Sequence, residues 1–296
     1  MDPIVGAALL SWDIRPEIIA GLLLAGGLFS MGWRRLHRRG SLLAAPWRLA
    51  SYLSGLTVLG LALMSPIDVL AGQLFYMHMI QHLLMVMLVP PLLLLANPFP
   101  LLLWGLPPRG RAVVAGWFKP GAGLRQTLRL LTPPGLAWLL FIGFFLGWHD
   151  PNAYNAALTS DTVHDLEHIT FFGSAMLYWW HVIGAGPRLH GQFSRSAKIA
   201  FLLVTVPVNM AAGITIAFAT EPLYTYYTTV PRFFGISVMN DQMLGGIIMW
   251  IPGSMMYIIA ALVLIAGLVQ REAEKAPLPE SEWATDEAML APGWER

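Results

Sequence analysis

The sequence predicts an all-α fold, a polytopic membrane bundle of seven transmembrane helices. Charged residues make up 12% of the chain and apolar residues 56%, whereas ordinary soluble domains carry roughly 25% charged residues. The apolar residues gather into seven runs, and most of these approach the ~20 residues that a helix needs to cross a bilayer. The predicted spans are residues 18–33, 47–64, 74–95, 133–148, 166–183, 199–219 and 244–269.

The basic residues set the number of spans and their direction. The fourth apolar run, residues 136–148, is short, but without it two basic loops would face opposite sides of the membrane. With seven spans, sixteen of the eighteen Lys and Arg residues lie on one side, and only Arg15 and Arg232 lie on the other. Because Lys and Arg are enriched on the cytoplasmic side, we expect the N-terminus outside and the C-terminus inside.

The chain divides into residues 1–270, the seven-span domain, and residues 271–296, an acidic cytoplasmic tail. The tail is rich in acidic residues and proline and poor in apolar residues, so we expect it to be disordered. The basic clusters are explained by membrane topology, which argues against a nucleic-acid partner. No phosphate-binding loop, nucleophile motif or catalytic carboxylate pair stands out, and an enzyme is not predicted.

Three features carry structural predictions within this frame. Pro90 and Pro91 lie inside the third span, where the missing N–H groups and the ring clash should kink the helix. Gly245 and Gly246 in the seventh span should allow close helix packing. The outer loop of residues 220–240 carries several Tyr and Phe side chains, which are typical of an interfacial aromatic belt; a lid or docking surface is the alternative.

Five of the eight histidines fall at the predicted outer ends of spans three, four and five. His78 and His82 are four residues apart, as are His164 and His168, so each pair projects from one side of its helix. His149 follows the fourth span. We interpret this convergence as a metal site near the outer surface, a shallow rim of imidazoles open to the outside from which an ion could be exchanged.

Other polar residues at the same end could belong to the site. Asp241, at the start of the seventh span, is either a helix N-cap or a metal ligand. Gln81, Asp150, Asp165 and Glu167 could orient the imidazoles by accepting a ring N–H. Asp165 and Glu167 cannot both face the same way as the histidines of their helix, so at most one of them is well placed.

The residue types present limit the choice of metal. The chain has no cysteine, which excludes thiolate copper sites, iron–sulfur clusters and covalently attached c-type haem. Imidazole suits copper, zinc or iron, and thioether suits Cu(I). Met77, Met79, Met239 and Met243 also lie at the outer end, although methionine in a membrane helix mostly serves packing.

Four ordered motifs resemble one known family. They are YMHMIQHLLMVMLVPPLLLLANP, the HDP after the fourth span, HDLEH entering the fifth span, and DQMLGGIIMWIPG in the seventh. Together they resemble the CtaG-like cytochrome c oxidase assembly factors, bacterial seven-span membrane proteins, over residues 51–269. An unrelated single-span copper chaperone shares the CtaG name, and this chain is not that protein.

The resemblance implies a role in maturing a haem–copper oxidase, by supplying or inserting copper. It implies oxidase subunits and a periplasmic or extracellular copper donor as partners, and the bacterial cell (inner) membrane as the location. Zinc or haem iron are the alternative metals. The family motifs fall on His78, His82, His149, His164, His168 and Asp241.

Other functions stay open on the sequence alone. One is a haem-binding electron carrier, with axial histidines from two different spans. Another is a metal transporter, which the lack of ionisable residues deep in the spans disfavours. A third is a scaffold whose histidines only hold helices together.

Overall fold

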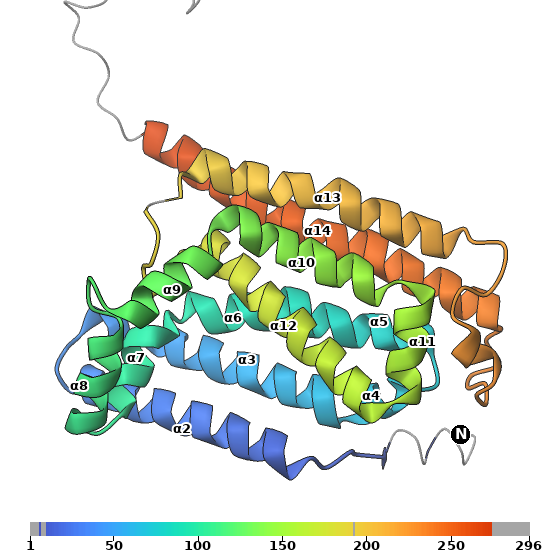
Figure 1. Ribbon diagram of the computed structural model, residues 1–296, viewed down its shortest axis with the longest axis horizontal. Helices are drawn as coiled ribbons and strands as arrows, with labels where there is room; N and C mark the ends of the chain where they lie inside the picture. The colour runs from blue at the N-terminus through green and yellow to red at the C-terminus, as the bar shows by residue number, and fades with distance from the viewer. Residues whose placement is uncertain (1–5, 7–9, 192, 274–296) are drawn as a thin grey trace, which may run out of the picture.

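Every regular element in the described part of the chain is helical (Figure 1). The computed structural model describes residues 6, 10–191 and 193–273. The long helices are α2 (Pro16–His37), α3 (Pro46–Met64), α10 (Pro134–Trp148), α12 (Asp161–Ile183), α13 (Arg195–Ala217) and α14 (Val238–Ala273). The shorter ones are α4 (Pro66–Ala71), α5 (Phe75–Leu83), α6 (Val89–Leu95), α7 (Pro98–Gly105), α8 (Pro108–Trp117), α9 (Gly123–Leu131) and α11 (Pro151–Thr159), with the turns η1 (Leu42–Ala44), η2 (Leu84–Leu88) and η3 (Thr225–Thr228). The all-α prediction is confirmed.

Five helical segments of the described chain are long and apolar enough to cross a membrane. They are α2, α3, residues 75–95, α13 and most of α14. Helices α9 and α10 would add a sixth span if this pair, bent by 58°, counts as one. Helix α12 has 23 residues, but its histidines and acidic residues lower its hydropathy. The membrane character is thus confirmed, while the count of seven and the sidedness stay predictions.

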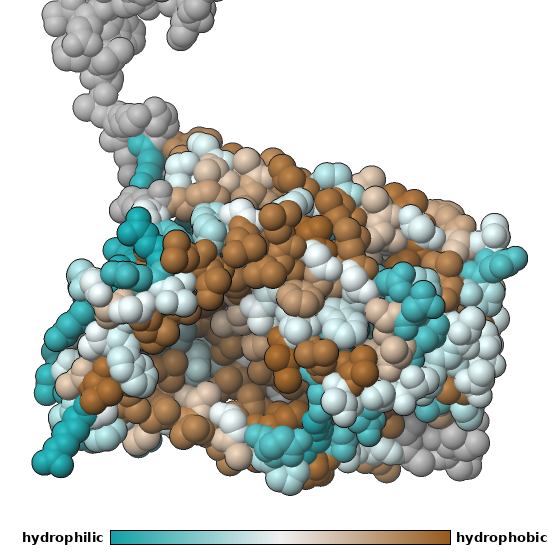
Figure 2. Space-filling view, viewed as in Figure 1, coloured by the Kyte–Doolittle hydropathy of each residue, from teal (hydrophilic) through white to brown (hydrophobic). Residues whose placement is uncertain are grey.

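The surface is arranged as a membrane protein requires. Figure 2 shows hydrophobic residues along the side of the bundle and most of the hydrophilic residues towards its two ends. Helices α7, α8 and α9 gather at one end, whereas α4, α11 and the loop that contains η3 lie at the other (Figure 1). We call the second of these the outer end, following the sequence prediction. Helix α14 continues three residues past the predicted boundary at residue 270, and residues 274–296 of the predicted tail lie outside the described part.

The third predicted span is divided by a π-helical turn. This turn, η2, separates α5 from α6 just before the two prolines. Pro90 has no N–H to donate to the carbonyl of Val86, four residues earlier, and the indole Nε1–H of Trp179 donates to that carbonyl instead, at 2.9 Å. The irregularity expected from the prolines therefore takes the form of a π turn, within a segment that remains one candidate span.

Helices α13 and α14 pack closely because glycines stand where they touch. A Cβ on Gly246 would lie 2.5 Å from the backbone nitrogen of Ala217, and one on Gly213 would lie 2.8 Å from the backbone nitrogen of Trp250. A Cβ on Gly245 would meet the ring of Phe75 in α5. The prediction that Gly245 and Gly246 serve close packing is confirmed, and this packing fixes α5, the first histidine helix, against α14.

Replacing Gly246 with alanine should destabilise the bundle by about 1–3 kcal/mol, because the new methyl group would clash with the backbone of Ala217 in α13. Thermal unfolding of the purified protein in detergent would show this as a lower midpoint. The matched control is Gly143→Ala in α10, where nothing lies within 4 Å of the added Cβ, and alanine favours the helix. Equal midpoints for the two variants would contradict the packing account.

Candidate metal centre

Three helices bring the five predicted histidines together at the outer end of the bundle. Helix α5 carries His78 and His82, α12 carries His164 and His168, and His149 is the residue directly after α10. The ring centroids of His78 and His164 are 5.4 Å apart, those of His82 and His168 are 5.7 Å apart, and those of His82 and His149 are 6.3 Å apart. The five imidazoles form one cluster.

Two overlapping groups in this cluster could hold a metal ion. In one, ring nitrogens of His78, His82 and His168 all lie within 4.8 Å of one another. In the other, His78 and His164 are joined by a carboxylate oxygen of Glu167 within the same limit. Because His78 belongs to both groups, we treat these five residues as one imidazole–carboxylate centre.

Most of the centre is buried, and the prediction of a shallow rim open to the outside does not hold for three of its imidazoles. His78 has 0% of its surface exposed, His82 4% and His168 6%. Helix α11 and the loop around η3 cover the outer end, and their Tyr154 and Tyr227 are themselves fully buried. These aromatic side chains fold inward over the imidazoles, so neither of them belongs to an interfacial belt. His149 and His164 are partly exposed, and moving this cover would also open the three buried imidazoles to an ion.

Most polar atoms of the cluster have no hydrogen-bond partner. A buried polar group without a partner costs roughly 1–3 kcal/mol, and a buried unpaired charge costs more. A cation among these lone pairs and carboxylate oxygens would remove the cost. The unpartnered atoms are His78 Nε2, His82 Nδ1 and Nε2, His149 Nε2, His164 Nε2, His168 Nε2 and both carboxylate oxygens of Glu167.

A chain of hydrogen bonds favours one tautomer of His78, the one in which every contact of the chain has a donor. The hydroxyl of Tyr227 donates to the carbonyl of Ala71 at 2.8 Å, and the hydroxyl of Tyr154 lies 3.2 Å from that of Tyr227. The Nδ1 atom of His78 lies 2.6 Å from the Tyr154 hydroxyl. A carbonyl only accepts, so the chain is complete when His78 Nδ1–H donates to Tyr154, and Tyr154 to Tyr227. This direction leaves His78 Nε2 as a free lone pair, the arrangement found at metal-binding histidines.

The tautomer of His149 is set in the same way by a single carbonyl. Its Nδ1 lies 2.6 Å from the carbonyl oxygen of Phe145, which can only accept, so Nδ1 carries the proton and Nε2 holds a lone pair. Burial lowers the pKa of His149 to about 4, against the opposing effect of that hydrogen bond. The imidazole is therefore neutral near pH 7 and able to act as a ligand.

Only one of the two acidic residues of α12 faces the cluster, as predicted. An oxygen of Glu167, which is 0% exposed, lies 3.6 Å from Nε2 of His82. Asp165 instead forms a two-pronged ion pair with Arg15, with N–O distances of 2.6 and 2.8 Å. Glu167 thus supplies the single carboxylate of the centre.

Gln81 and Asp150 do not orient imidazoles, so that part of the prediction is wrong. The side-chain amide of Gln81 donates to the carbonyl of Ala62 and to the carboxylate of Asp68. The carboxylate of Asp150 accepts from the backbone N–H groups of Asn152 and Ala153 and caps α11. Both side chains hold the surrounding helices in place.

Asp241 lies apart from the centre. Its two carboxylate oxygens accept hydrogen bonds from the backbone N–H groups of Phe75 and Tyr76, at 3.1 and 2.9 Å. It also forms an ion pair with Arg232 at 2.7 Å. The predicted N-cap role in its own helix is wrong, because Asp241 lies within the first turn of α14; its carboxylate caps α5 instead. By fixing the first turn of α5, it positions the helix that carries His78 and His82.

The remaining histidines lie at the other end of the molecule. His181 Nε2 is 2.9 Å from the carbonyl of Thr132, and His190 Nε2 is 2.9 Å from the hydroxyl of the same residue. His37 stacks on Trp33. Each of these three has an ordinary structural partner, which makes them suitable controls for the outer cluster.

Comparison with known proteins identifies the family. The model of the cytochrome c oxidase caa3 assembly factor (Caa3_CtaG) matches residues 27–271, which include the whole imidazole–carboxylate centre. The chain belongs to this family. The description of this family is that of a cytochrome c oxidase assembly factor. The resemblance seen in the four sequence motifs is thus confirmed.

Curated relatives from mycobacteria extend this comparison. Uncharacterised proteins of Mycobacterium bovis and Mycobacterium tuberculosis are each 26% identical over 300 residues, covering 96% of this chain and 44% of their own length. An uncharacterised protein of Mycobacterium leprae is 25% identical over 268 residues, covering 86% of this chain and 39% of its own. The chain thus spans less than half of the length of these curated relatives. No solved structure matches it.

Proposed function

We propose that this member of the assembly-factor family binds copper at the buried imidazole–carboxylate centre and aids its insertion into a haem–copper cytochrome c oxidase. The observation that carries the proposal is the set of unpartnered imidazole nitrogens and carboxylate oxygens that converge in a buried space. The family supplies the oxidase as the partner. Copper is the substrate of this protein, which would receive it from a periplasmic or extracellular donor and transfer it to the oxidase.

The donor set fits copper. Imidazole binds copper and zinc well, and the carboxylate of Glu167 balances part of the charge of a divalent ion. A site that delivers its ion must also release it, and the cover of α11 and the η3 loop offers a means of control, because moving it would expose the centre. Docking against the oxidase in the membrane is the event that we expect to move it.

The arrangement of the rings does not suit a haem carrier. Two axial histidines must stand on opposite faces of a porphyrin, with the macrocycle between them. Here the rings of His78 and His164, on different helices, are 5.4 Å apart, and those of His82 and His168 are 5.7 Å apart, with the other imidazoles of the cluster packed beside them. Imidazoles in direct contact can share a small ion but leave no space for a macrocycle.

We also propose the seven-span topology in a bacterial cell membrane, with the N-terminus outside and the C-terminus inside. Besides the distribution of basic residues, the salt bridges support it. The two basic residues assigned to the outer side are both neutralised, Arg15 by Asp165 and Arg232 by Asp241. Basic residues are normally enriched on the cytoplasmic side. The two arginines on the outer side depart little from this rule, because their charges are balanced by carboxylates.

Introduced cysteines test this topology, because the chain has no cysteine of its own. Thr159→Cys in α11 should react with a membrane-impermeant thiol reagent in intact cells. Thr127→Cys in α9, a matched change at an equally exposed position, should react only after the cells are opened. The reverse pattern would overturn the proposed sidedness.

Metal binding itself is tested on the purified protein in detergent. We expect ~one equivalent of copper per chain, with each ligand loss weakening binding, because the remaining imidazoles cannot complete the coordination shell. The variant His82→Ala/His168→Ala should lose the ion, and the control His37→Ala should keep it, as measured by elemental analysis after dialysis. Copper retained equally by both variants would rule out this centre.

A further inference from the structure

A small cavity lies beside the imidazole–carboxylate centre, on the side of α14. It has a volume of about 30 Å³, enough for a single ion and no larger group. Its walls include imidazoles and thioethers, and the remainder is almost entirely apolar. Met79, His82, His149 and Met249 supply these groups.

One lone pair already points towards this cavity. His149 lines it, and the bond from its Nδ1 to the carbonyl of Phe145 leaves Nε2 unprotonated, buried and without a partner. An apolar cavity gives such a nitrogen nothing to bind. This residue takes no part in either of the two ligand groups of the main centre, so the main centre does not explain it.

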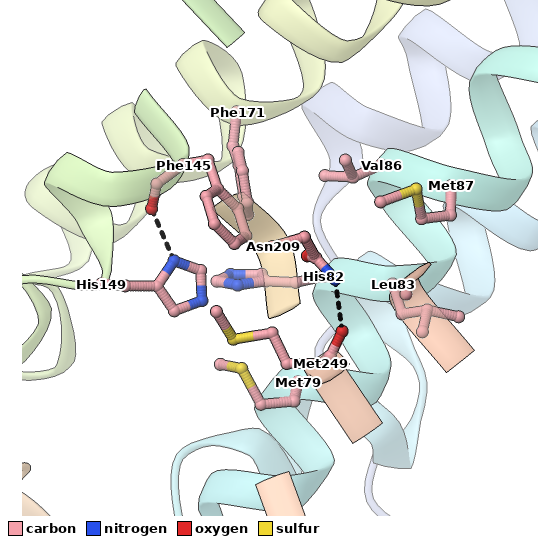
Figure 3. Close-up of a pocket in the computed structure, with 11 residues that line it drawn as sticks. Met79, His82, Leu83, Val86, Met87, Phe145, His149, Phe171, Asn209 and Met249 are labelled. Atoms are coloured by element: carbon pink, nitrogen blue, oxygen red, sulfur yellow. Dashed lines mark hydrogen bonds between the residues drawn. The ribbon is translucent and has the colours of Figure 1, made fainter. Parts of the chain in front are cut away.

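Two methionines face the same space from two different helices. Met79 is on α5, and Met249 is on α14 at the point where its carbonyl accepts a hydrogen bond from Asn209. Figure 3 shows their side chains ending beside the rings of His82 and His149. Both are buried, 3% and 7% exposed. The space therefore combines thioether sulfur with imidazole nitrogen.

We propose that Met79, Met249, His149 and His82 form a second copper subsite that is selective for Cu(I). Thioether ligands select Cu(I), whereas zinc and Cu(II) favour imidazole and carboxylate. A monovalent ion also suits a cavity without an acidic lining residue, because less charge has to be balanced there. The subsite rests on the proposed copper function and adds to it a preference for the reduced ion.

His82 connects the subsite with the main centre. It lines the cavity and also belongs to the group with His78 and His168. Both of its ring nitrogens are unpartnered, but a neutral imidazole offers only one lone pair at a time. His82 can therefore serve one position or the other, and when an ion passes between the two, the ring proton of His82 moves to the nitrogen that the ion leaves.

The test compares Cu(I) with Zn(II) on the full chain, purified in detergent, with copper kept reduced by ascorbate. X-ray absorption of the Cu(I)-loaded protein should show sulfur as well as nitrogen ligands. Met249→Leu and Met79→Leu keep the apolar volume, so the fold should survive. We expect each to weaken Cu(I) binding roughly tenfold or more, measured against a competing Cu(I) chelator, and to leave Zn(II) affinity unchanged.

The control is Met85→Leu, a buried methionine of the neighbouring turn that does not line the cavity. It should leave the affinities for both ions unchanged. Cu(I) bound without sulfur ligands, or with the same affinity in Met249→Leu as in Met85→Leu, would overturn the subsite while the main centre still binds Zn(II). Failure of the protein to bind either ion would overturn the proposed copper function as well.

Discussion

In cells that carry His82→Ala, the cytochrome c oxidase should lose copper and activity to about the level of cells without the assembly factor. His82 belongs to the main group of potential ligands and also lines the adjacent cavity, so its removal interrupts both positions. Haem content should fall less, because the proposed function concerns copper. The measurement is copper and haem per purified oxidase. Added copper in the medium should restore part of the activity if delivery is the defect.

The matched control is His190→Ala, at the other end of the bundle, where the imidazole bonds to the Thr132 hydroxyl. That strain should load its oxidase normally. Because His82 is buried and its loss leaves a space, the amount of assembly factor in each strain must be compared, and His82→Gln retains more of the volume. Equal copper loading in the two strains, at equal protein levels, would remove the link between this centre and oxidase maturation.

Replacing Glu167 with glutamine should weaken binding of divalent copper or zinc by about 10–100-fold. The amide has the same shape but no charge, so the centre loses the carboxylate that faces its imidazoles. The metal-free variant should be as stable as the parent or more stable, because an unpartnered buried acid has been replaced by a neutral group. Metal titration and thermal unfolding of the purified protein measure the two effects.

Asp165→Asn is the control for this change, since it removes the other acid of the same helix, two residues away. Asp165 pairs with Arg15 at the protein surface, so its loss should leave the metal affinity unchanged. A fall in affinity for Asp165→Asn as large as that for Glu167→Gln would indicate a long-range electrostatic effect, and the carboxylate of Glu167 would no longer count as part of the centre.

The positions of the histidines could be predicted because they depend on two simple quantities. A spacing of four residues places His78 with His82, and His164 with His168, on one side of each helix. The order of the spans then places both pairs and His149 at the same end. The same reasoning limited α12 to one inward-facing acid, and the structure shows which of the two it is.

The cover and the supporting residues could not be predicted in this way. Tyr154 and Tyr227 lie outside the spans, where no periodicity shows which way a side chain points, and an aromatic loop at a membrane surface usually faces the interface. Met249 lies three turns inside α14 and reaches the histidines only through the close packing that the glycines allow. The sequence predicts how deep a residue lies along a span, but it does not predict which loops or neighbouring helices cover that residue.

The π turn at residues 84–88 has a consequence for how the two halves of the third span are constrained. A π turn acts like one extra residue in an α-helix, which rotates the part after it by about 100° relative to an unbroken helix. The outer half, α5, packs against α14 and α4, while the inner half, α6, packs against α12 and against α3, where Ser51 donates to the carbonyl of Leu92. The extra residue therefore allows α5 and α6 to present different faces to their neighbours. Substitutions that reshape the contact of α6 with α3 can therefore accumulate without turning His78 and His82 away from their partners, whereas deleting a single residue from this turn would swing one half of the helix out of register with the other.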